Sequence, residues 1–172
     1  MAIKRYGTLS PHGAPVQNSN IIANSITIAV NDSVKAASGF IALGTAGALV
    51  WGHVMGLGTK DGMPLNTTGV AGAAIGSFVG TFASGSDNQT VAKDKAIMDV
   101  SKFTLYSAEL SAAIGTTTGS NLIGYRMDLT DEDTLDESTA VTTTAQYGTH
   151  GVDPVTTANA VVNVYESQVF GV

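Results

Sequence analysis

Apolar and polar residues alternate in several short stretches of the chain, and each stretch predicts a β-strand with one buried face. In the first, Ile26, Ile28 and Val30 alternate with small or polar residues. The alternation returns at 103–108, and the run AVVNVYE at 160–166 predicts the last strand. Further short strands are expected at 96–100, 122–127 and 140–147. Short strands separated by glycine- and threonine-rich turns favour an all-β barrel or sandwich.

The stretch from Gly39 to Gly58 contains no charged residue and admits two interpretations. A helix of this length would be long enough to cross a bilayer. Its interior glycines and His53 make a poor helix, however, and no cluster of Lys or Arg flanks it. We therefore expect a β-hairpin, with strands at 40–43 and 49–57. The second glycine-rich stretch, 69–83, is compatible with a helix or a strand.

The distribution of charge divides the chain into regions. Residues 1–102 carry a net charge of +2 and residues 103–172 a net charge of −8. Such an acidic C-terminal region would be repelled by phosphate backbones, so nucleic-acid binding is not expected there. The first 24 residues contain two prolines and no sustained periodicity. The prediction is an extended N-terminal arm (1–24), a glycine-rich β domain (25–100) and an acidic β domain (101–172), with no evident internal repeat.

Catalytic chemistry is not expected. The chain has no Cys, which removes disulfides, thiolate nucleophiles and sulfur-ligated metals. Its three histidines, His12, His53 and His150, are not accompanied by a nucleophile motif. The glycines around Gly56 match neither the dinucleotide fingerprint nor a P-loop. We therefore predict a protein that is not an enzyme and needs no cofactor.

The most concentrated chemistry is the acidic stretch DLTDEDTLDE, residues 128–137, in which six of ten residues are acidic. An EF-type calcium loop requires a glycine at its sixth position, and neither possible starting residue provides one. A looser calcium site at Asp131, Asp133 and Asp136 remains an alternative. The favoured interpretation is an exposed loop, or one helical turn capped by Thr130, that faces solvent or a neighbouring subunit.

Several segments occur along the chain in a characteristic order. The N-terminal region contributes NDSVKAASGFIAL. The C-terminal half contributes DVSKFTLY, GTTTGSN, DLTDEDTLDESTAVTTTAQYGTHGVDP and VVNVYESQVFG. In their order and texture, these segments resemble small structural proteins encoded beside the major capsid protein of tailed bacteriophages. The resemblance covers about residues 25–172.

This resemblance implies a head decoration protein, also called a cement protein, at the capsid surface of the virion. Such proteins are mostly β, bind the outside of an assembled capsid, and often form trimers. The implied partners are the major capsid protein and further copies of the chain, with neither nucleic acid nor membrane. Tail or head–tail components and glycan-binding β modules are the alternatives. Arms of such proteins commonly reach neighbouring subunits, so contacts are expected in the arm, at Lys4, Arg5, Tyr6, Pro11 and Pro15.

Overall fold

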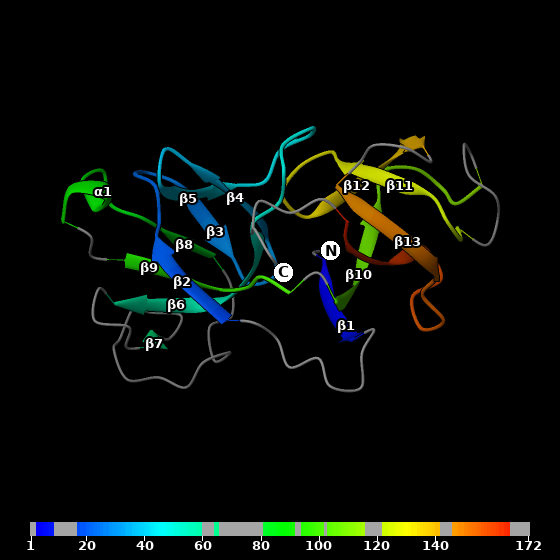
Figure 1. Cartoon of the computed structure of the whole chain (residues 1–172), viewed down its shortest axis with the longest axis horizontal. Coiled ribbons are helices and arrows are strands. Elements are labelled where there is room, and N and C mark those ends of the chain that lie inside the picture. The colour runs from blue at the N-terminus through cyan, green and yellow to red at the C-terminus, as the bar shows by residue number, and fades with distance from the viewer. Residues whose placement is uncertain are drawn as a thin grey trace.

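The computed structural model describes residues 3–8, 17–59, 64–65, 81–91, 94–101, 103–115, 122–141 and 146–165. Within these residues the chain is almost entirely β, which confirms the predicted class (Figure 1). The single helix of this described part is α1 (Asn88–Val91). The strands are β1 (Lys4–Thr8), β2 (Gln17–Ile21), β3 (Thr27–Ala29), β4 (Ser33–Ala37), β5 (Phe40–Leu43), β6 (Gly52–Thr59), β7 (Pro64–Leu65), β8 (Thr81–Ala83), β9 (Asp94–Asp99), β10 (Thr104–Leu110), β11 (Arg126–Leu129), β12 (Thr134–Val141), β13 (Tyr147–Val152) and β14 (Asn159–Val164).

The C-terminal strands form a closed five-stranded barrel. The path around it runs β10-β14-β13-β11-β12 and returns to β10. All neighbours are antiparallel except β10 and β12, whose parallel pairing at Leu110 and Leu135 closes the barrel. The N-terminal strand β1 adds antiparallel to β10.

The N-terminal strands form a second barrel beside the first, as Figure 1 shows. Their order is β2-β9-β6-β4-β5, and all of these neighbours are antiparallel. A parallel bridge between Ile22 and Ile41 brings β5 back to the end of β2 and closes the circuit. The short pair β3 and β8 lies outside this circuit.

The two barrels have the same topology. Numbered in chain order, the strands of each follow the path first, fifth, fourth, second, third, and the first and third are parallel. The closing hydrogen bond is also repeated: the Ala23 N–H donates to the Ile41 carbonyl, and the Ser111 N–H donates to the Leu135 carbonyl. Both barrels carry a register irregularity where the fourth strand pairs with the fifth, between Val54 and Gly56 in β6 and between Thr149 and Gly151 in β13. The chain therefore contains a structural repeat.

The two hydrophobic cores use equivalent positions of this repeat. When the two barrels are aligned by their closing hydrogen bonds, β9 is equivalent to β14. The residues KAIMDV at 95–100 then correspond one by one to NAVVNV at 159–164. Both cores are built from the inward side of the alternating strands, as a closed barrel requires. The equivalent buried pairs are Ile22 and Leu110, Val34 and Met127, Ile41 and Leu135, Ala96 and Ala160, Met98 and Val162, and Val100 and Val164.

Several sequence predictions need correction. Strands occur in the stretch 40–57, but β5 and β6 are not a hairpin, because β4 lies between them. The strand expected at 140–147 overlaps two strands, because β12 ends at Val141 and β13 begins at Tyr147. Within the stretch expected to be an arm, β2 is the first strand of the N-terminal barrel and β1 is a strand of the other sheet. Among the described residues, no helix is long and apolar enough to span a membrane.

Candidate functional site

The acidic stretch is a β-hairpin that reaches the N-terminal barrel. Its residues complete β11, make a tight turn at 130–133 and begin β12. The turn closes through the Thr130 N–H, which donates to the Thr134 carbonyl at 2.8 Å. The Ser33 N–H donates to the Glu132 carbonyl at 2.7 Å, which attaches the turn to the start of β4. The expected loop or helical turn is therefore a hairpin that contacts the other barrel of its own chain.

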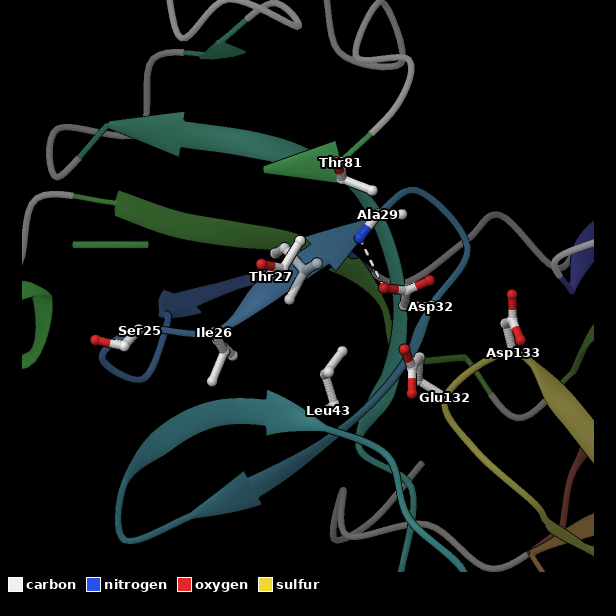
Figure 2. Close-up of a pocket in the computed structure, with 10 residues that line it drawn as sticks. Ser25, Ile26, Thr27, Ala29, Asp32, Leu43, Thr81, Glu132 and Asp133 are labelled. Atoms are coloured by element: carbon white, nitrogen blue, oxygen red, sulfur yellow. Dashed lines mark hydrogen bonds between the residues drawn. The ribbon is translucent and has the colours of Figure 1, made fainter. Parts of the chain in front are cut away.

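The hairpin turn forms one wall of an open groove between the barrels (Figure 2). The groove has a volume of about 480 Å³. The opposite wall comes from β3 and the turn that follows it, as the residues drawn in Figure 2 show. The lining residues are Ser25, Ile26, Thr27, Ile28, Ala29, Asp32, Leu43, Thr81, Glu132 and Asp133. Three carboxylates thus gather in a partly apolar groove.

Asp32 is the buried member of this group. Its side chain accepts a 2.6 Å hydrogen bond from the Ala29 N–H, and it is 5% exposed. Burial raises the pKa of Asp32 to about 6, the bond from Ala29 opposes this rise, and the charges of Glu132 and Asp133 add to it. The groove therefore holds a carboxyl group that changes its charge in mildly acidic solution.

The alternative of a calcium site receives no support from the hairpin. Asp131 and Asp133 lie in the turn, where the Asp133 N–H donates to the Asp131 side chain at 3.2 Å. Asp136 lies in β12 and accepts hydrogen bonds from the Ser111 and Ser138 hydroxyls. In the part of the chain that the structure describes, no three His, Asp or Glu side chains are grouped to hold a metal ion.

A buried polar cluster lies where the two barrels meet. The Tyr147 hydroxyl, from β13, lies 2.9 Å from His53 Nε2 and 2.8 Å from the Ser33 Oγ. The ring of His53, in β6, stacks on Tyr106 of β10, with 3.8 Å between ring centroids. A further bond runs from the Gln146 side chain to the Thr45 carbonyl at 2.9 Å. We call Ser33, His53, Tyr106 and Tyr147 the junction cluster.

Ser33 and His53 of the junction cluster, with Asp99 opposite His53 on β9, superficially form a Ser–His–Asp set, but their geometry does not fit nucleophilic catalysis. Ser33 Oγ lies 3.4 Å from His53 Nε2. The Asp99 carboxylate accepts from the Ser101 N–H and the Thr104 hydroxyl, and His53 Nδ1 has no hydrogen-bond partner among the described residues. A catalytic base must be oriented by a third group, and here the candidate third group is bonded elsewhere.

Burial also sets the charge states in the junction cluster. It lowers the pKa of His53 to about 3, so the imidazole is neutral at physiological pH. It raises the pKa of Tyr106 and Tyr147 well above the ordinary range, so both phenols keep their protons. Ser33, His53 and Tyr147 are at most 1% exposed. The cluster therefore joins the two barrels through buried polar contacts whose groups stay uncharged at neutral pH.

A second groove lies on the outer face of the C-terminal barrel, with a volume of about 330 Å³. Arg126, the only basic residue after position 102, places its guanidinium 3.5 Å from the centroid of the Tyr165 ring and donates to its hydroxyl. His150 Nε2 lies 2.8 Å from the Asn163 side-chain oxygen. The lining residues are Gly124, Tyr125, Arg126, Gly148, Thr149, His150, Asn163 and Tyr165. Such a mixture of aromatic and polar side chains can bind a small polar ligand.

Three of the five residues predicted as contacts lie in a described strand. Lys4, Arg5 and Tyr6 lie in β1, where Lys4 is opposite Ser107 and Arg5 is opposite Tyr106. Pro11 and Pro15 lie outside the described residues. The junction cluster was not predicted, because its members come from strands that are distant in sequence. Only the unusual placement of His53 in an apolar strand could have indicated it.

Relatives give no further indication of what the grooves bind. Comparisons with protein-family models, with curated proteins and with solved structures found no match to this chain.

Proposed function

We propose that this protein is a structural component of a phage virion that binds the outer surface of an assembled capsid and stabilises it. Its partners would be the major capsid protein and further copies of itself. The segment order that resembles capsid decoration proteins supplies the identity of the partner.

The observation that carries the proposal is the path of the N-terminal strand. β1 precedes the N-terminal barrel in sequence, yet it pairs with β10 of the C-terminal barrel. A terminal strand that adds to a distant sheet uses main-chain hydrogen bonds, which do not require a particular side-chain sequence. The two barrels are also joined by buried polar contacts at the junction cluster. Two barrels held together by buried contacts, with an N-terminal strand that pairs with the more distant barrel, suit a protein that reinforces a shell.

Shell binding tests this proposal directly. Capsid shells that lack the protein are mixed with the purified chain, sedimented, and imaged by cryo-electron microscopy. We expect the wild-type chain to bind the outer surface, and the Lys4→Ala/Arg5→Ala variant to bind at least about tenfold more weakly, because charged contacts guide and hold such interfaces. Lys35→Ala, which removes a lysine of the N-terminal barrel, is the matched control.

The outcomes separate the components of the proposal. No binding of the wild-type chain to shells would refute the capsid function. Normal binding of the Lys4→Ala/Arg5→Ala variant would refute only the assignment of the contact residues. Density on the tail rather than the head would favour a tail or head–tail component of the same virion.

A second candidate function, glycan binding, is favoured by the outer groove at Arg126. Exposed aromatic rings beside planar polar side chains provide stacking and directional hydrogen bonds to a polar ligand. If the groove binds a glycan, a glycan array should identify it, and Arg126→Ala should weaken that binding about tenfold, which is the effect of losing a charged hydrogen bond. Lys35→Ala again serves as the control. Silence of the wild-type chain on the array would remove this candidate.

A further inference from the structure

A small cavity lies beside the junction cluster and has a volume of about 150 Å³. The turn between β3 and β4, the strands β6 and β9, and β10 of the other barrel all contribute to its wall. The lining residues are Val30, Asn31 and Met55, which are half-buried, and His53, Val54, Asp99 and Tyr106, which are at most 2% exposed. The cavity therefore extends from a partly exposed mouth to the contact between the barrels.

Tyr106 brings to this cavity a buried hydroxyl that has no hydrogen-bond partner among the described residues. Burial raises the pKa of this phenol most, and the nearby charge of Asp99 adds to the rise. The Asp99 carboxylate, however, accepts from the Thr104 hydroxyl at 2.8 Å on one oxygen and from the Ser101 N–H at 3.0 Å on the other. A buried hydroxyl that has lost its bonds to water destabilises the folded state unless another group replaces them.

His53 contributes a second buried atom without a partner among the described residues, its Nδ1. The other ring nitrogen, Nε2, lies 2.9 Å from the Tyr147 hydroxyl and 3.4 Å from Ser33 Oγ. Neither Tyr147 nor Ser33 lines the cavity, whereas His53 does. The two nitrogens lie on different sides of the imidazole, so Nδ1 is directed away from these partners and toward the cavity. Because this ring stacks on Tyr106, the two unpartnered atoms belong to adjacent side chains, one from each barrel.

These atoms define the chemistry of a ligand. Burial lowers the pKa of His53 to about 3, so the ring is neutral and one nitrogen donates while the other accepts. If the Tyr147 hydroxyl donates to Nε2, Nδ1 is a donor; if Nε2 donates to Tyr147, Nδ1 is an acceptor. A ligand that can both donate and accept fits either tautomer. The carboxylate of Asp99 disfavours an anion, and both of its oxygens are already bonded, so a neutral ligand fits best.

We propose that the cavity binds a small neutral molecule that bridges His53 Nδ1 and the Tyr106 hydroxyl. Ordered water and a small organic molecule with one donor and one acceptor share this chemistry. A cavity of this volume can hold a single aromatic ring, and unsatisfied polar atoms in its wall favour an occupant that forms hydrogen bonds. Since each barrel supplies one of the two atoms, the bound molecule stabilises the contact between the barrels. The inference does not depend on the proposed capsid function.

Pyrazole is a suitable probe, because it is neutral and carries one donor and one acceptor. Benzene, a ring of similar size without either, is the matched control. We expect pyrazole to shift the amide signals of residues 53–55 and 106 in nuclear magnetic resonance spectra, and benzene to bind at least about tenfold more weakly. A high-resolution crystal structure of the wild-type chain without pyrazole shows whether ordered water bridges the two atoms.

These two measurements distinguish the sources of the ligand. Bridging water without pyrazole binding assigns the site to water, and pyrazole binding at these residues assigns it to small organic molecules. If the crystal structure shows no bridging density and pyrazole does not bind, or if benzene binds as tightly as pyrazole, the proposal is wrong.

Tyr106→Phe gives an independent test, since it removes the hydroxyl and retains the ring that stacks on His53. If a molecule bonds to this hydroxyl, the variant should melt about 2 to 4 °C below the wild type. An empty cavity predicts the opposite sign, because the substitution then removes a buried hydroxyl that has no partner. Thr90→Val, which removes an exposed hydroxyl from α1, is the control and should not change the melting temperature. A melting temperature that rises in Tyr106→Phe would overturn the proposal.

Discussion

Replacing His53 by alanine should lower the free energy of unfolding by about 3 kcal/mol, since it removes a buried ring and a buried hydrogen-bond partner together. The ring lies against Tyr106, and its Nε2 lies 2.9 Å from the Tyr147 hydroxyl. Both partners belong to the other barrel, so the loss falls on the contact that joins them. Denaturant unfolding monitored by near-ultraviolet circular dichroism measures the change.

Two further variants divide this effect into its parts. His53→Phe keeps an aromatic ring against Tyr106 and should cost about 1 kcal/mol, as should Tyr147→Phe, which removes the hydroxyl bonded to Ser33. Their double mutant should cost less than the sum, because each single change breaks the same hydrogen bond. His150→Ala, at an exposed histidine, is the control and should change stability by less than about 0.5 kcal/mol. A His53→Ala variant as stable as this control would refute the role of the junction cluster.

Asparagine in place of Asp32 should stabilise the protein at neutral pH and have little effect near pH 4. Burial raises the pKa of Asp32 to about 6, from an ordinary value of 3.8. The folded state therefore binds more protons than the unfolded state between these values. The free energy of unfolding then falls as pH rises through this interval. The substituted amide cannot ionise, so at pH 7 the variant should be more stable by about 1 to 2 kcal/mol, after allowance for solvent screening.

The titration of His53 changes the free energy of unfolding with pH in the opposite direction. Its effect must therefore be separated from that of Asp32. Burial lowers the pKa of His53 to about 3, from 6.5, so the unfolded state binds the extra proton and stability falls as pH decreases through that interval. The comparison of Asp32→Asn with its parent is therefore best made in a His53→Phe background as well as in the wild type. Asp87→Asn, at an exposed carboxylate in the turn before α1, is the control. Equal pH profiles for Asp32→Asn and its parent would contradict the prediction.

The local pattern predicted which residues form strands better than it predicted how those strands pair. Alternation at 26–30 and 103–108 correctly indicated strands, because alternating side chains reflect a buried and an exposed face. The pairing of β5 with β4, rather than β6, could not be read from the stretch 40–57. Strand neighbours depend on which edges remain open after the whole sheet has formed, and this information is spread along the chain.

The repeat was invisible in the sequence for a related reason. A barrel core accepts any apolar side chain of suitable volume, so Met98 can be the counterpart of Val162 and Val34 of Met127. The equivalent fourth-to-fifth strand connections also differ greatly in length, since β6 and β9 are separated by residues 60–93 and β13 and β14 by only 153–158. What the two halves retain is register, and register is expressed in hydrogen bonds rather than in residue identity.

The sequence alone determined the β class, the lack of thiol chemistry and the concentration of negative charge at 128–137, because composition and periodicity are local properties. Only the tertiary structure decided what these residues contact. It placed the turn of the acidic hairpin against Ser33 and buried Asp32 in the same groove. It also brought His53 onto Tyr106, and both side chains line one cavity. Such contacts join positions far apart in the chain, and closure of the two barrels creates them.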